Sequence, residues 1–110
     1  MQLHDHGGQL ALQVLRGQGV DTIYTLSGGH IFPFYDAAVK REPAVRILDV
    51  RHEQTATFAA EAAAKLTRNV GVAVLTAGPG VTNGVSAVTS AQFNGSPVLV
   101  LGGRAPQGRW

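Results

Sequence analysis

Residues 70–80 read VGVAVLTAGPG. The first six residues are apolar or glycine, a length and composition typical of a strand that is buried on both faces. The next five combine two glycines with a proline, and Pro79 suits the first turn of a helix. A buried strand that leads through a glycine loop into a helix is the repeating unit of α/β folds with a parallel sheet.

The same alternation extends to both sides of this stretch. Further strands are predicted at Thr22–Leu26, Val45–Val50 and Pro97–Leu101, and helices at about Leu10–Gly17, Ile31–Lys40, Arg51–Arg68 and Pro79–Gln92. Parallel strands need right-handed crossovers and helices on both faces. The predicted fold is therefore α/β, with three layers (α/β/α) around a parallel sheet.

In such a sheet every strand-to-helix loop lies at the carboxyl edge. The loops in question are Ser27–His30, Asp49–Glu53, Thr76–Gly80 and Gly102–Arg104. We therefore expect the polar and glycine-rich residues of the chain to converge on one rim.

Composition narrows the function. A length of 110 residues fits one domain, and a net charge of +2 without a run of Lys or Arg disfavours nucleic-acid binding. The absence of Cys excludes disulfides and thiolate metal sites. His4 and His6 lie close to the terminus, and His30 and His52 have no partner at metal-binding spacing, so no metal ligand is expected in this chain. Without a signal peptide or a membrane-length apolar run, we expect a cytoplasmic location.

The helix Arg51–Arg68 has two apolar stripes. One holds the larger side chains and faces away from a polar stripe; its members are Phe58, Ala59, Ala62 and Leu66. The polar stripe includes Glu61 and Lys65, a favourable i,i+4 pair. The second apolar stripe is Ala56, Ala60 and Ala64, aligned with Glu53, and we expect it to meet a neighbour at close range.

Three positions leave alternatives open. Glu53 is either a carboxylate stabilised by the helix dipole or a partly desolvated functional group. Gly78 and Gly80 either bind phosphate or form a tight turn with positive φ, and neither G-x-G-x-x-G nor a Walker lysine is present. Gly28 and Gly29 carry the same ambiguity.

Four segments together resemble the acetolactate synthase family. RHEQTA at 51–56 is similar to its R-H-E-Q-x-A segment, and TAGPGVTN at 76–83 is similar to its T-x-G-P-G-x-x-N motif. TLSGGH at 25–30 with YDA at 35–37, and the stretch 92–104, are also similar to that family. The resemblance implies the N-terminal pyrimidine-binding (PYR) domain of a thiamine diphosphate enzyme.

By this resemblance the cofactor lies between the PYR domain of one subunit and the diphosphate-binding domain of another. The family's glutamate falls on Glu53, whose hydrogen bond to the ring nitrogen N1′ would promote the imino form; N4′ of that form then deprotonates the thiazolium for attack on a 2-keto acid. The other residues implied to line the cofactor and the subunit boundary are Gly28, Gly29, Thr76, Gly78, Pro79, Gly80 and Asn83. The alanine stripe would let the Glu53 helix approach the partner subunit or cofactor closely.

The family's diphosphate domain binds Mg²⁺ through a G-D-G motif and a downstream Asn, and this chain has no G-D-G. Residues 1–110 are therefore expected to form a truncated, partial PYR domain that is inactive alone. The full enzyme is expected to be a homodimer or homotetramer that contains Mg²⁺ and serves branched-chain amino acid biosynthesis. Whether it also binds FAD stays open.

Two other functions fit the sequence. Relatives that resemble 2-hydroxyacyl-CoA lyases and oxalyl-CoA decarboxylases share the Ser-Gly-Gly-His and Leu-Gly-Gly-Arg-Ala-Pro forms, so the substrate is a 2-keto acid or a 2-hydroxyacyl-CoA. From a different class, a non-catalytic flavodoxin-like module would use the glycine loops to bind a nucleotide or a partner, with Glu53 as an ordinary helix-start residue.

Overall fold

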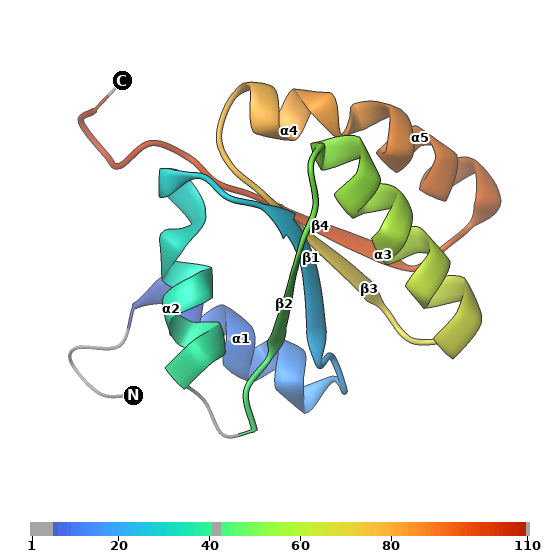
Figure 1. Cartoon of the computed structure of the whole chain (residues 1–110), viewed down its shortest axis with the longest axis horizontal. Helices are drawn as coiled ribbons and strands as arrows, with labels where there is room; N and C mark the ends of the chain where they lie inside the picture. The colour runs from blue at the N-terminus through green and yellow to red at the C-terminus, as the bar shows by residue number, and fades with distance from the viewer. Residues whose placement is uncertain (1–5, 41–42, 110) are drawn as a thin grey trace.

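The computed structural model describes residues 6–40 and 43–109. The elements follow in the order α1 (Gly7–Gly17), β1 (Thr22–Leu26), η1 (Gly29–Ile31), α2 (Phe32–Lys40), β2 (Arg46–Asp49), α3 (Glu53–Thr67), β3 (Gly71–Leu75), α4 (Pro79–Asn83), α5 (Val85–Asn94) and β4 (Val98–Gly102). The four strands form one sheet in the order β2-β1-β3-β4, and every pair is parallel. The predicted parallel α/β fold is confirmed (Figure 1).

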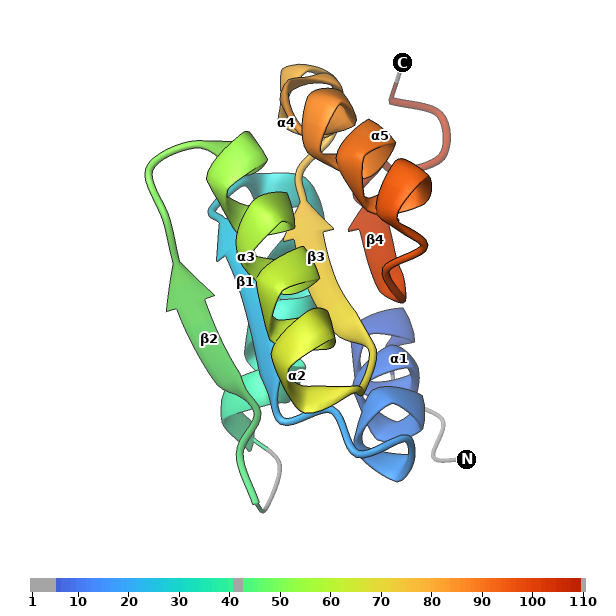
Figure 2. The same cartoon turned by 90° about the vertical axis from the view of Figure 1, so that its right-hand side faces the viewer.

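Helices cover both faces of the sheet, which gives the predicted three layers. Helices α1 and α2 pack together on one face, and α3 and α5 pack together on the other (Figures 1 and 2). In the middle of the sheet, Tyr24 of β1 pairs with Leu48 of β2 and with Ala73 of β3. This register aligns the carboxyl ends of the strands along one edge.

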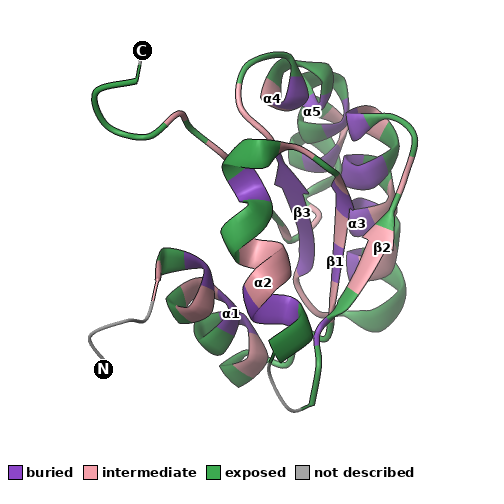
Figure 3. Cartoon of the chain, turned by 60° about the vertical axis from the view of Figure 1, so that its left-hand side comes forward, coloured by how far each residue is buried: buried purple, intermediate pink, exposed green. Residues whose placement is uncertain are grey.

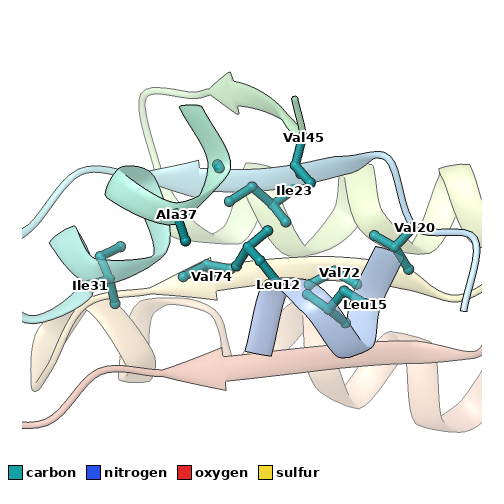
Figure 4. Close-up of a cluster of buried hydrophobic side chains, with 10 residues drawn as sticks. Leu12, Leu15, Val20, Ile23, Ile31, Ala37, Val45, Val72 and Val74 are labelled. Atoms are coloured by element: carbon teal, nitrogen blue, oxygen red, sulfur yellow. The ribbon is translucent and has the colours of Figure 1, made fainter. Parts of the chain in front are cut away.

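The large apolar side chains gather on the face that α1 and α2 cover. Val72 and Val74 of β3 point into this cluster together with Leu12 of α1 and Ile23 of β1 (Figure 4). All four are fully buried. Because removing such a side chain leaves a cavity, a Leu→Ala change here costs about 2–5 kcal/mol. This half of the core therefore provides most of the apolar burial in the domain.

On the opposite face the sheet packs against a side of α3 that consists largely of alanine. Every residue of β3 is buried (Figure 3). A Cβ added to Gly71 would lie 1.9 Å from the carbonyl oxygen of Ala60, so the α3 backbone almost touches the strand. The residues that α3 buries are Glu53, Ala56, Thr57, Ala60, Glu61 and Ala64. The alanine stripe does meet a neighbour at close range, and that neighbour is the sheet of the same chain.

The other apolar stripe of α3 does not face the sheet. Phe58 is 39% exposed and Leu66 is 86% exposed, because the alanine face occupies the space against the sheet. The Glu61–Lys65 ion pair does not form among the described residues either. Glu61 is buried and accepts hydrogen bonds from Ser90 Oγ at 3.3 Å and Asn94 Nδ2 at 3.4 Å.

The predicted element boundaries mostly hold to within two residues. One exception is α1, which begins at Gly7, three residues before the predicted Leu10. The other is the helix predicted at Pro79–Gln92, which is two helices, α4 and α5, divided at Gly84. A Cβ on Gly84 would lie 2.7 Å from Leu75 Cδ1, so the chain turns there in close contact with β3. No described helix combines the length and the apolarity that a membrane crossing requires.

Thr25 fixes α2 to the middle of the sheet. Its Oγ1 donates to the carbonyl oxygen of Val74 at 2.6 Å and lies 2.7 Å from the hydroxyl of Tyr35. The single Thr25 hydroxyl proton goes to the carbonyl, so Tyr35 must be the donor to Thr25. Burial, the largest cause, raises the pKa of Tyr35, and the nearby Asp49 raises it further. Tyr35 therefore stays protonated and keeps this bond.

Candidate functional site

The predicted rim at the carboxyl edge of the sheet is present. The loop after β1 touches the loop after β3, since a Cβ on Gly28 would lie 2.3 Å from Thr76 Oγ1. The loop after β4 touches the η1 turn, since a Cβ on Gly103 would lie 2.9 Å from the carbonyl oxygen of His30. These contacts need residues without side chains. The glycines therefore allow the loops to approach one another closely. The loops lie on one rim, as predicted from the parallel sheet.

Glu53 stands at the start of α3 on this rim. His52 is the N-cap, and its Nδ1 accepts a hydrogen bond from the backbone N–H of Gln54 at 3.0 Å. The capping side chain is thus His52, which leaves the Glu53 carboxyl group available for other contacts. Glu53 is only 8% exposed. An acidic side chain is rarely so buried without specific partners, so its surroundings matter for function.

The two carboxyl oxygens of Glu53 have different neighbours. Oε1 accepts a hydrogen bond of 3.2 Å from Nδ2 of Asn83, at the end of α4. Oε2 faces Gly80, whose added Cβ would lie 3.7 Å away. Within residues 6–40 and 43–109 the structure gives Oε2 no hydrogen-bond donor. One oxygen is therefore held by the protein and the other lies beside a position that has no side chain.

A second polar atom on the rim lacks a partner. Oγ1 of Thr76 is buried and makes no hydrogen bond within the described part of the chain. Its side chain lies between Gly28 and Gly80, whose added Cβ atoms would come within 2.3 and 2.8 Å of it. Buried hydroxyls usually have a partner, so an unmatched one near an unmatched carboxyl oxygen suits a polar ligand.

The remaining predicted site residues lie on the same loops but do not contact Glu53. Gly78 has φ = 68°, so the tight-turn interpretation of this glycine is confirmed. Pro79 is the first residue of α4, and an added Cβ on Gly29 or Gly78 would meet no atom within 4 Å. These three positions border open space. Nothing among the described residues forms a group of three or more His, Asp or Glu that could hold a metal ion.

Thr57 and Gly84 were not singled out from the sequence, yet they position Glu53. Thr57 Oγ1 donates to the backbone carbonyl of Glu53 at 3.2 Å, one turn along α3. An added Cβ on Gly84 would lie 3.2 Å from that same Oγ1. Glu53, Thr57 and Glu61 are polar and recur every four residues, so they lie along one side of α3. This spacing could have indicated from the sequence that this side of α3 packs against α5.

Topology alone does not separate the two classes of function considered above. The order β2-β1-β3-β4 is also the beginning of the flavodoxin-like order, in which ligands bind at the carboxyl edge of the sheet. The residues on the rim and the similarity to known proteins have to decide between a flavodoxin-like module and a PYR domain.

Comparison with known proteins favours the PYR domain over the flavodoxin-like module. Residues 5–110 match the family described as thiamine pyrophosphate enzyme, N-terminal TPP binding domain. A probable acetolactate synthase of Mycobacterium bovis and the acetolactate synthase large subunit of Mycobacterium tuberculosis are each 58% identical to the chain over 105 residues. The alignment covers 96% of this chain and 19% of each relative.

A second group of relatives carries a different activity in its name. The 2-hydroxyacyl-CoA lyase 2 of Mus musculus is 55% identical over 100 residues, which are 91% of this chain and 16% of the relative. The chain thus spans about a fifth or less of the length of these relatives. It belongs to the thiamine pyrophosphate enzyme family, and residues 5–110 match that family's N-terminal TPP binding domain.

Proposed function

We propose that this domain forms the pyrimidine side of a thiamine diphosphate site and that Glu53 is its catalytic residue. One observation carries the proposal: Glu53, a residue only 8% exposed, has one carboxyl oxygen held by Asn83 and the other, Oε2, without a donor beside Gly80. A carboxyl oxygen that lacks a protein donor can share a proton with a ring nitrogen. The diphosphate and Mg²⁺ would be bound by a separate domain.

Glu53 acts in this proposal through a single proton. Its Oε2 holds the proton shared with N1′ of the aminopyrimidine and returns it as the reaction proceeds. When bound, thiamine diphosphate supplies a thiazolium carbon that attacks the carbonyl carbon of the substrate. A positioned acid or base contributes about 10²–10⁴ in rate. The helix start keeps the carboxyl group on the rim, and the surrounding small residues exclude water from it.

The other rim residues would shape the cofactor's surroundings. Thr76 would offer its unpartnered hydroxyl to the ring, and Gly80 would leave room beside Oε2. The residues proposed to line the outer part of the site are Gly28, Gly29, Gly78 and Pro79. Asn83 completes the proposed set through its contact with Glu53.

For the complete protein we propose an acetolactate synthase-like reaction, in which one 2-keto acid is decarboxylated and condensed with another, as in branched-chain amino acid biosynthesis. The 58% identity to the mycobacterial synthases supports it. The competing candidate is cleavage of a 2-hydroxyacyl-CoA, supported by the 55% identity to the mouse lyase. A homodimer or homotetramer, FAD binding and a cytoplasmic location are further parts of the proposal, and they rest on the sequence resemblance.

Glu53→Gln tests the proposed role. In the complete protein saturated with thiamine diphosphate and Mg²⁺, NMR measures exchange of the thiazolium C2 proton. The amide keeps the shape of the side chain but has no carboxyl proton to share, so we expect exchange to slow by about 10²-fold or more. Glu61→Gln makes the same change two turns along α3, and there exchange should be unchanged. Equal exchange rates in Glu53→Gln and wild type would refute the role.

Product analysis separates the two reactions. The complete protein is incubated with pyruvate in one experiment and with a 2-hydroxyacyl-CoA in another. Formation of acetolactate supports the synthase, and release of formyl-CoA or an aldehyde from the thioester supports the lyase. Turnover of only the thioester would refute the preferred reaction while leaving the role of Glu53 intact.

A further inference from the structure

The hydrogen bond between Asn83 and Glu53 joins two separate elements at the candidate site. Nδ2 of Asn83 donates to Oε1 of Glu53 at 3.2 Å. Asn83 is the last residue of α4, a helix of five residues that ends at Gly84. Glu53 is the first residue of α3, thirty positions earlier. The bond therefore depends on how α4 sits against α3.

The backbone next to Asn83 is fixed in place by close packing. A Cβ on Gly84 would lie 2.7 Å from Leu75 Cδ1 and 3.2 Å from Thr57 Oγ1. Thr57 in turn donates to the backbone carbonyl of Glu53. Gly84 and Glu53 thus contact the same threonine, and the side chain before Gly84 is set opposite the Glu53 carboxyl group.

This arrangement makes the two carboxyl oxygens of Glu53 inequivalent. A carboxyl group with no fixed neighbour rotates about its terminal bond, where the torsional preference is broad. Asn83 occupies Oε1, which leaves Oε2 on the side of Gly80. The donor is a neutral amide, so it orients the carboxyl group without adding a charge to the site.

We propose that Asn83 is a positioning residue that selects Oε2 of Glu53 as the oxygen presented to the cofactor's ring nitrogen. The inference rests on the proposed function of Glu53 and gives Asn83 a role that acts through Glu53. A direct contact between Asn83 and the cofactor is the alternative. The two differ in one respect: a positioning residue has no effect once Glu53 can no longer perform its task.

The test is a double-mutant cycle in the complete protein. The variants are Asn83→Ala, Glu53→Gln and the double variant, with Asn83→Asp as a second change of almost the same shape. Two quantities are measured with Mg²⁺ present: the dissociation constant for thiamine diphosphate and the C2 exchange rate at saturation. A cycle isolates the coupling between two side chains in contact.

Asn83→Ala should slow exchange by about tenfold and weaken cofactor binding by a smaller factor, because the hydrogen bond that orients the Glu53 carboxyl group is lost. Asn83→Asp should slow exchange at least as much, since it replaces the donor with a second carboxyl group. In the Glu53→Gln background, Asn83→Ala should change neither quantity further. Thr82→Ala, on the same short helix, is the matched control and should behave as wild type.

The outcomes separate the two proposals. If Glu53→Gln slows exchange but Asn83→Ala and Asn83→Asp do not, the positioning role is overturned and the function of Glu53 stands. If the effect of Asn83→Ala persists in full in the Glu53→Gln background, Asn83 acts directly and the positioning role is again overturned. If Glu53→Gln itself leaves exchange unchanged, the proposed function of Glu53 is refuted, and the positioning role of Asn83 is refuted with it.

Discussion

Gly71 of β3 and Ala60 of α3 are in direct backbone contact, because a methyl group on Gly71 would lie 1.9 Å from the carbonyl oxygen of Ala60 and 2.6 Å from its carbonyl carbon. Both atoms belong to the main chain, which no side-chain rotation can move aside. The separation of α3 from the sheet is therefore set by the absence of a side chain at Gly71, and Glu53 shares the helix whose depth is so determined.

We expect Gly71→Ala to destabilise the protein by about 1–3 kcal/mol or more, because the extra methyl group must push α3 outward. Chemical denaturation with far-UV circular dichroism measures the loss. Gly17→Ala is the control, since an added Cβ there meets no atom within 4 Å. A Gly71→Ala variant as stable as Gly17→Ala would contradict the contact.

A second prediction concerns Glu61. Ser90 and Asn94 of α5 donate to its buried carboxyl group. Replacing both donors with Ala should cost about 1–3 kcal/mol, because the carboxyl group would stay buried without them. Lys65→Ala should cost less than about 0.5 kcal/mol, as expected for an exposed residue. If Lys65→Ala and the replacement of both donors lowered the free energy of unfolding equally, the Glu61–Lys65 pair that the sequence suggested would be supported instead.

Asp36 should make stability depend on pH. Hydrogen bonds from Lys40 and then His6, at 2.7 and 2.8 Å, lower the pKa of Asp36 from its usual 3.8. A lowered folded-state pKa contributes stability above the unfolded value and loses it as pH falls through the folded value. Asp36→Asn should therefore lower the melting temperature slightly at neutral pH.

The difference between Asp36→Asn and wild type should close as the pH falls below about 3.8, where the carboxylate of the folded protein becomes protonated. Because the side chains are partly exposed, the effect should also shrink in high salt. Thermal melts of both proteins across this pH range give the answer. A difference that stays constant down to acidic pH would exclude the ion pairs as its source.

Gly80 provides a test of the space beside Glu53. An added methyl group would lie 2.8 Å from Thr76 Cγ2 and 3.7 Å from Glu53 Oε2. In the double variant Gly80→Ala with Thr76→Ser, the atom that clashes is gone while the hydroxyl stays. We expect this variant to be as stable as Thr76→Ser alone but to bind thiamine diphosphate about tenfold more weakly, because the methyl group remains beside Oε2. Titration of the complete protein compares the two, and equal affinity would show that the space is not used.

Much of the fold was predictable because parallel strands impose their own geometry. The strands around Ile23, Val74 and Val100 were visible as short apolar runs, and parallel pairing then required their following loops to share one edge. That rule placed Glu53 and the glycine loops together before any coordinates were known. The sequence left Gly78 and Gly80 open between a phosphate site and a turn with positive φ, and only Gly78 has the positive φ.

What the sequence did not predict depends on packing between distant segments. The apolar pattern of α3 did not show that Phe58 and Leu66 face outward, which follows from the close contact of Gly71 with the alanine face of the helix. The break at Gly84 was missed because one glycine is tolerated inside a helix, and its cause is contact with Leu75. The bond from Asn83 to Glu53 joins residues thirty positions apart, beyond any local pattern.

The small-residue seam between α3 and β3 also limits how this chain can change over evolutionary time. An enlargement at Ala60 or Gly71 would tilt the whole helix and move Glu53 with it, although both residues lie far along α3 and β3 from the rim. Substitutions should therefore accumulate on the exposed side of α3, at positions such as Leu66, while the buried side changes little. The position of Glu53 therefore depends on the absence of larger side chains at Ala60 and Gly71.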